Sequence, residues 1–216
     1  FFNMNTDLFI RSACMIAIYI GFTVISARYG DVLLAVSSIL MKLLLLFSYF
    51  TDGFAYAGEA LTGKYIGAKN PPMLRQTIKW TFIWSMSIAS LFILIYYFAG
   101  VPMLKVMTSD IEAAKDYLPW LLLMPIVGCA AFTWDGIYIG ATASKGMRDS
   151  TLWAVAVFTS VWGLGMLLLN AFVAKDSANY GVFALHVLMA AYFAHLVART
   201  VYLTYNRNKC VAFLKQ

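Results

Sequence analysis

Six long apolar stretches alternate with short polar segments along the 216-residue chain. Each stretch holds about 20 residues, which is enough for a helix to cross the roughly 30 Å hydrocarbon layer of a bilayer. Hydrocarbon offers no hydrogen-bond partner, so each stretch must satisfy its own backbone polar groups as a helix. The pattern predicts an all-α polytopic membrane protein with six transmembrane helices in a single transmembrane domain. The expected spans are residues 8–27, 32–61, 80–99, 117–143, 152–173 and 181–205.

Turn and capping signals mark the connections between these spans. The segment 63–72 is basic and rich in turn residues, and Arg75 and Lys79 follow it, so we expect a basic connection there. Between the third and fourth spans, Ser109 and Glu112 have the spacing of a capping box, which predicts a short helix at the membrane surface. Pro125 predicts a kink in the fourth span. At the start of the chain, Asp7 and Arg11 are four residues apart, and we expect them to neutralise each other.

A polar stripe runs along the second expected span. Its members recur at steps of three or four residues and therefore share one helical face. They are Ser38, Lys42, Leu45, Tyr49, Asp52, Tyr56 and Glu59. Ionisable side chains at bilayer depth cost a few kcal/mol or more and usually face a bundle interior or a watery cavity. The stripe therefore predicts a cavity lining; alternatively, Lys42 reaches the surface by snorkelling and Glu59 already lies at the water interface.

The Asp-Gly pair of this stripe recurs in the fourth span. Asp52-Gly and Asp135-Gly begin twelve-residue segments that match at four positions, 83 residues apart. A carboxylate that exchanges a proton for a cation is the group that an antiporter needs, and aromatic faces can hold an organic cation. We therefore count Asp52 and Asp135, with the nearby Tyr49, Tyr56 and Tyr138, as candidates for a substrate or cation cavity. The alternative is that each Asp-Gly caps or kinks the inner end of its span.

Composition and charge narrow the function classes. The chain is 62% hydrophobic and 12% charged, against about 25% charged in soluble domains. Ten Lys and Arg residues, with Arg199 counted among them, fall on one side of the expected membrane and four on the other. By the positive-inside rule both termini are cytoplasmic, so the net charge of +6 indicates topology and not nucleic-acid binding. No catalytic motif and no metal-ligand spacing is present, so we expect no enzyme activity, no cofactor and no metal site.

Three blocks of sequence carry a family resemblance. SARYGDVLLA at 26–35, SYFTDGFAYAGEALTGKYIGAKN at 48–70 and YLPWLLLMPIVGCAAFTWDGIYIGATASKGMRDS at 117–150 resemble the DinF-like branch of the MATE (multidrug and toxic compound extrusion) transporters. The resemblance implies the C-terminal lobe, spans seven to twelve, of a two-lobed twelve-helix transporter in a bacterial inner membrane. The absence of an initiator Met agrees with that expectation. The implied partners are the lipid bilayer, an N-terminal six-helix lobe of the same transporter and a small organic substrate.

The resemblance also implies a mechanism. Members export amphipathic or cationic organic compounds in exchange for protons or sodium ions. In several branches a carboxylate on the tenth span helps bind the coupling cation, and Asp135 occupies the corresponding stretch. An acid that some branches carry on the seventh span has no counterpart, because Arg11 is the only charge between residues 8 and 27.

Two other functions stay open at this point. One is a flippase for lipid precursors or polysaccharides with a related architecture. The other is a non-transporting membrane scaffold in which the buried charges only pair helix to helix. Neutralising Asp135 is expected to cost a scaffold its stability and a transporter its activity.

Overall fold

The computed structural model describes the backbone of residues 2–175, 177 and 179–210, and the side chains of 4–175, 177 and 179–208. Six described helices are long and apolar enough to cross a membrane, which confirms the predicted fold class. No strand occurs in these ranges. The elements are α1 (Phe2–Ser26), η1 (Ala27–Tyr29), α2 (Asp31–Gly67), α3 (Pro71–Met107), α4 (Ile111–Lys115), α5 (Leu118–Gly140), α6 (Ser144–Phe172), α7 (Tyr180–Tyr205) and α8 (Arg207–Cys210).

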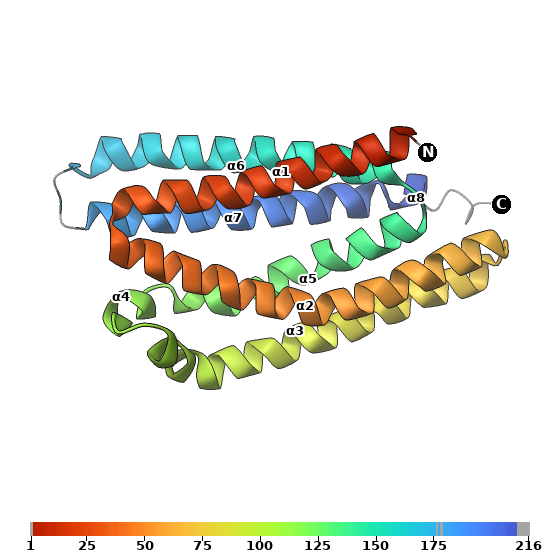
Figure 1. Ribbon diagram of the computed structural model, residues 1–216, viewed down its shortest axis with the longest axis horizontal. Helices are drawn as coiled ribbons and strands as arrows, with labels where there is room; N and C mark the ends of the chain where they lie inside the picture. The colour runs from red at the N-terminus through yellow and green to blue at the C-terminus, as the bar shows by residue number, and fades with distance from the viewer. Residues whose placement is uncertain (1, 176, 178, 211–216) are drawn as a thin grey trace.

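The long helices form two groups of three (Figure 1). In one group α6 packs against α7 and α1, and in the other α2 packs against α5 and α3. The two groups meet chiefly where α5 contacts α7, whereas α1 and α2 touch little after the tight turn at η1. The beginning of α1, the end of α7 and the α2–α3 and α5–α6 turns all lie at one end of the bundle, as Figure 1 shows.

The helices are longer than the apolar stretches that predict them. The connection expected at 63–72 is shorter than predicted, since α2 continues to Gly67 and α3 already begins at Pro71, which leaves residues 68–70 in the turn. The side chain of Asn70 accepts a hydrogen bond from the Met73 N–H at 3.2 Å, and proline fits the first turn of a helix because it lacks an N–H to satisfy. At 37 residues each, α2 and α3 reach roughly 55 Å. Both therefore extend beyond the hydrocarbon layer or tilt within it.

The surface helix between α3 and α5 exists, but its predicted capping box does not. Asp110 takes the N-cap position of α4, and no side chain caps this end. The hydroxyl of Thr108 accepts a hydrogen bond from the Asp110 N–H at 3.1 Å instead. Glu112 pairs with Lys115 at 2.6 Å, so its carboxylate is engaged one turn further along the helix. The local turn at Thr108 therefore begins this helix.

Two glycines bring α5 against α2. A Cβ atom on Gly136 would lie 2.2 Å from the Ala55 carbonyl oxygen, and one on Gly140 would lie 2.3 Å from that of Glu59. Only glycine permits this approach, which is the use that membrane helices make of small residues four positions apart. Nearer the start of α2, Tyr96 of α3 donates a hydrogen bond to the Leu43 carbonyl oxygen at 2.7 Å. These contacts fix α2 between α3 and α5.

Candidate functional site

A buried cluster of three charged side chains inside the bundle centres on Asp135. Its carboxylate accepts a hydrogen bond from Arg11 of α1 at 2.7 Å and from Arg199 of α7 at 2.6 Å. The side chain of Arg199 is fully buried, and those of Arg11 and Asp135 are 20% and 14% exposed. A buried arginine without a carboxylate partner is strongly unfavourable, so this cluster is required for the two helix groups to meet here. It joins α1 and α7 of one group to α5 of the other.

The predicted pairing of Asp7 with Arg11 is wrong. Asp7 contacts Arg148 of α6 at 2.6 Å and accepts a hydrogen bond from Ser144 at 2.9 Å. Its neighbours on α6 lie closer than the residue one turn along its own helix. Arg11 is thereby left to pair with Asp135.

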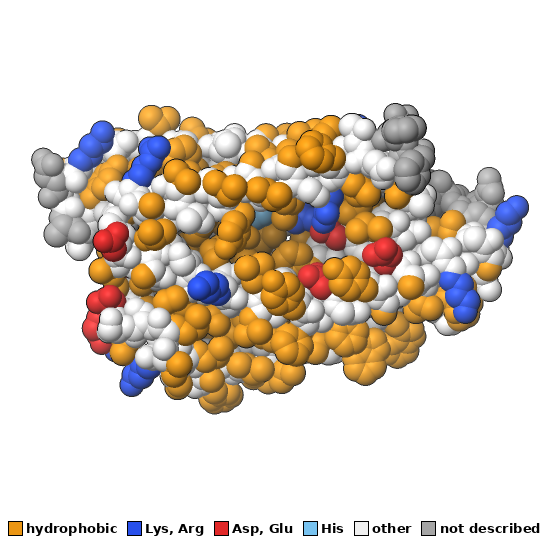
Figure 2. Space-filling view, viewed as in Figure 1, with side chains coloured by type: hydrophobic (Ala, Val, Ile, Leu, Met, Phe, Trp, Pro, Cys, Tyr) orange, Lys and Arg blue, Asp and Glu red, His pale blue; other side chains and the backbone are white. Residues whose placement is uncertain are grey.

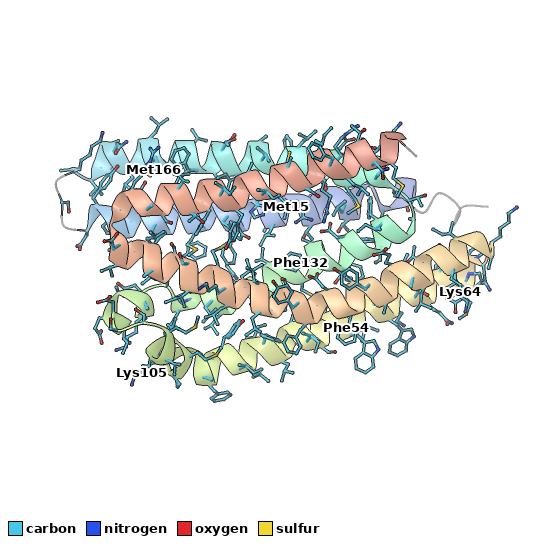
Figure 3. The ribbon with its side chains drawn as sticks, in the orientation of Figure 1. Met15, Phe54, Lys64, Lys105, Phe132 and Met166 are labelled. Carbon is cyan, nitrogen blue, oxygen red and sulfur yellow. The ribbon has the colours of Figure 1, made fainter. Side chains whose placement is uncertain are left out.

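A cavity of about 260 Å³ opens beside the cluster, between α1, α2 and α5. Its lining residues are Arg11, Met15, Asp52, Ala55, Tyr56, Glu59, Phe132, Asp135, Gly136 and Ile139. In Figure 3, Met15 on α1 and Phe132 on α5 lie across from each other at this gap. Figure 2 shows acidic and basic side chains gathered in the middle of a mostly apolar face over these helices. The cavity therefore combines carboxylates with aromatic and aliphatic walls.

Among the predicted site residues, four line this cavity and three do not. Asp52, Tyr56, Glu59 and Asp135 come together there, although they derive from two different helices. Of the rest, Lys42 and Tyr49 are exposed on α2 without lining it. Tyr138 is buried on another face of α5, where its hydroxyl donates to the Leu203 carbonyl oxygen at 2.7 Å. Three of the seven residues of the predicted stripe thus line the cavity.

Asp52 differs from Asp135 in its partners. It is half-buried and has no ion pair with any residue whose side chain the structure describes. Its charge lies within electrostatic reach of Asp135 and Arg11. Asp52 shares the absence of an ion pair to a described residue with Glu59, the third carboxylate of the cavity, and of the two it is the one within electrostatic reach of Asp135 and Arg11.

The alternative role of Asp-Gly as a helix-end cap is not what the structure displays. Asp52 lies in the interior of the 37-residue α2, and Asp135 lies five residues before α5 ends. The side chain of Asp135 bonds two arginines of other helices. The two segments pack against each other, because Gly136 and Gly140 rest against Ala55 and Glu59 of the other segment.

The pairing role of Arg199 was missed by the sequence reasoning. Its charge was counted with the loop residues, although it falls inside the expected sixth span and is fully buried. The count on the more basic side of the membrane is therefore nine, against four on the other. The available signal was a charged residue inside an apolar stretch, which indicates an internal partner. The same signal applies to Arg11 in the first span.

The two histidines of α7, His186 and His195, lie in separate surroundings. His186 accepts a hydrogen bond from the Trp120 indole N–H at 2.9 Å and stacks on Tyr117 with ring centroids 4.6 Å apart. His195 is buried beside Tyr192, with ring centroids 4.5 Å apart. The two imidazoles form no common site.

The sequence is similar to known proteins. The MatE family model matches residues 8–168. The "DNA damage-inducible protein F" of Escherichia coli (strain K12) is 36% identical over 158 residues, which cover 72% of this chain and 34% of that protein. The chain thus spans about a third of the length of this relative. No solved structure matches the chain.

Proposed function

Because the chain belongs to the MatE family, we propose that it forms one six-helix lobe of a secondary active transporter. The proposed cargo is an amphipathic or cationic organic compound, expelled in exchange for protons or sodium ions. The proposed setting is a bacterial inner membrane, with the end of the bundle that holds the α2–α3 turn in the cytoplasm. That end carries most of the lysines and arginines of the connections.

One observation supports the proposal: two carboxylates without an ion pair to a described residue, Asp52 and Glu59, border the same cavity as the doubly paired Asp135. The five charged groups of the site are two arginines and three carboxylates, Asp52, Asp135 and Glu59. One negative charge is therefore in excess when all are ionised. A cavity with one surplus carboxylate attracts a single cation. A proton, a sodium ion and an organic cation each satisfy that requirement, and they compete for the same group.

In this proposal Asp135, Arg11 and Arg199 hold the helices around the cavity in place and do not themselves bind the transported cation. Both arginines bind Asp135, so a cation entering the cavity would have to displace a guanidinium to reach it. Asp52 presents no such barrier. Tyr56 and Phe132 supply aromatic surface beside it, which favours an organic cation over a small inorganic one once the coupling ion leaves.

The Asp135 cluster and the cavity also bear on the two alternative functions, a scaffold and a flippase. A scaffold and a transporter both need the Asp135 cluster for stability, so neutralising Asp135 does not separate them. A scaffold has no use for Asp52 and Glu59, which lie without an ion pair to a described residue at an open cavity. A flippase for lipid-linked sugars would require a cavity suited to a large polar headgroup, whereas 260 Å³ with aromatic walls favours a small cargo. A partner lobe facing α1 and α2 would enlarge this space. The exposed Tyr49 and Tyr56 of α2, at 68% and 66% exposure, give that lobe an aromatic surface to face.

Reconstitution tests this proposal. Vesicles that contain the chain together with a matching N-terminal six-helix lobe are expected to transport a fluorescent organic cation against an imposed proton or sodium gradient. Vesicles with the chain alone are expected to show no gradient-dependent transport, because half of the cavity wall is missing. Gradient-driven transport by the chain alone would refute the two-lobe assignment, and no transport by the pair would refute the proposed cargo class.

A further inference from the structure

A second cavity, of about 800 Å³, lies on another face of α5. Its lining comes from α3, α5, α7 and α8, and it shares no lining residue with the Asp52 cavity. The two cavities lie on different faces of α5, because residues at different positions of the helical turn point in different directions. Ala130 and Trp134 face the large cavity, while Phe132 and Asp135 face the small one. The proposed transport site therefore gives no role to this second space, which we call the α3–α7 groove.

The inner wall of the α3–α7 groove is apolar and held in place. Phe82 of α3 meets Trp134 edge-on, with ring centroids 4.9 Å apart. The Trp134 indole N–H donates to the hydroxyl of Thr204 on α7 at 2.9 Å, which joins the two sides of the groove. Ile78 and Ile83 continue the wall along α3. Such a surface suits a hydrocarbon chain.

One rim of the groove is basic. Lys79 of α3 and Arg207 at the start of α8 line this rim. Asn208 adds an amide beside them, and none of the lining residues that the structure describes is acidic. Two cations therefore lie at one end of an apolar slot without an ion pair to any described residue, and charge complementarity favours an anion there.

The rim lies at the depth of lipid headgroups. Trp80 follows Lys79 directly and Trp84 lies one turn further, and each is 54% exposed. Exposed tryptophans of membrane helices sit at the interface between headgroups and hydrocarbon. The cations thus reach headgroup level, while Phe82 and Ile83 continue towards the hydrocarbon.

We propose that the α3–α7 groove binds an anionic phospholipid, with its phosphate at Lys79 and Arg207 and an acyl chain along Phe82 and Trp134. Basic pockets between membrane helices on the cytoplasmic side recognise such headgroups. A soluble phosphate would leave the apolar wall uncovered, and a neutral phospholipid would bring no net charge to the two cations.

Lipid titration of the full chain, followed by native mass spectrometry, tests the assignment. Phosphatidylglycerol is expected to bind more tightly than phosphatidylcholine of the same chains. The double variant Lys79→Gln/Arg207→Gln is expected to lose affinity for phosphatidylglycerol on the order of tenfold. The matched control Arg28→Gln/Lys105→Gln removes the same charge from exposed residues outside the groove and is expected to change affinity less than twofold. Figure 3 shows Lys105 at the far end of the α2–α3 hairpin from Lys64.

A second variant separates the groove from general charge attraction. Ile83→Trp fills the apolar wall without changing charge and is expected to weaken phosphatidylglycerol binding while the melting temperature is kept. Equal losses in the groove and control variants, or equal affinity for both lipids, would overturn the proposal. Displacement of the lipid by glycerophosphate alone would overturn it in favour of a soluble-phosphate site.

Discussion

The two Asp-Gly pairs of this chain have the same sequence and opposite surroundings. Asp135 is held by Arg11 at 2.7 Å and Arg199 at 2.6 Å, and Gly136 behind it leaves no room for a side chain against Ala55. Asp52 has no ion pair with any described residue, and a Cβ on Gly53 would meet no atom within 4 Å. One pair builds the joint between the helix groups, and the other stands at an open cavity.

The difference shows that a carboxylate's role in a membrane bundle is decided by the helices around it. Both aspartates lie in apolar helices and both border the same cavity. Only Asp135 meets cations from α1 and α7, so its charge is already compensated. An aspartate in a transmembrane helix is thus a candidate for ion coupling only after its partners have been counted.

The largest expected effect on stability comes from Asp135→Asn. This change leaves Arg199 fully buried beside Arg11 with no carboxylate for either, a kind of loss that typically costs about 3–5 kcal/mol. Thermal unfolding in detergent should register a clear fall in melting temperature. The double variant Asp135→Asn/Arg199→Met removes both charges and should recover part of the loss. A melting temperature equal to wild type in the single variant would mean that the cluster is not structural.

The glycines provide a second, smaller contrast. Gly136→Ala forces a methyl group against the Ala55 carbonyl oxygen, and we expect a loss of about 1–3 kcal/mol as α2 and α5 separate. Gly53→Ala meets open space in a helix interior and should gain roughly 0.5–1 kcal/mol from helix propensity. Chemical denaturation of both variants under one condition measures the difference. Equal effects of the two changes would contradict the close approach at Gly136.

Lys42→Met should have the smallest effect. If the Lys42 amine paired with a carboxylate, its removal would leave that carboxylate unpaired and destabilise the bundle. The structure instead leaves Lys42 exposed, without an ion pair to any described side chain. We expect the free energy of unfolding to stay within about 0.5 kcal/mol of wild type. A fall as large as that of Asp135→Asn would reveal a partner for this lysine.

Much of the fold followed from the sequence because six apolar stretches leave a membrane protein few options. Helix ends were harder to predict: α2 and α3 run beyond the apolar residues, and Asn70 with its prolines ends the turn after only three residues. Hydropathy detects the hydrocarbon layer, whereas the helix end is set by local capping.

The site was predicted only in part for a related reason. Periodicity placed Asp52, Tyr56 and Glu59 on one face of α2, and the structure keeps them together. Periodicity along one chain carries no information on which helices become neighbours. For this reason the sequence predicts a local pair of Arg11 with Asp7, and it does not reveal that Arg199 pairs with Asp135. The signal in Gly136 and Gly140 was present, since small residues four apart indicate a close helix contact. The spacing of these two glycines predicts a close helix contact on α5, but it does not predict which helix makes that contact.

Efflux by the Asp52→Asn variant, assembled with a partner lobe, tests the central claim most directly. The measurement is transport of a fluorescent organic cation into or out of vesicles at several external pH values and sodium concentrations, with the melting temperature recorded alongside. If Asp52 is the available carboxylate, gradient-coupled transport should fall at least about tenfold while the melting temperature stays close to wild type, because no ion pair is broken. Wild-type transport with unchanged pH and sodium dependence in Asp52→Asn would contradict the account.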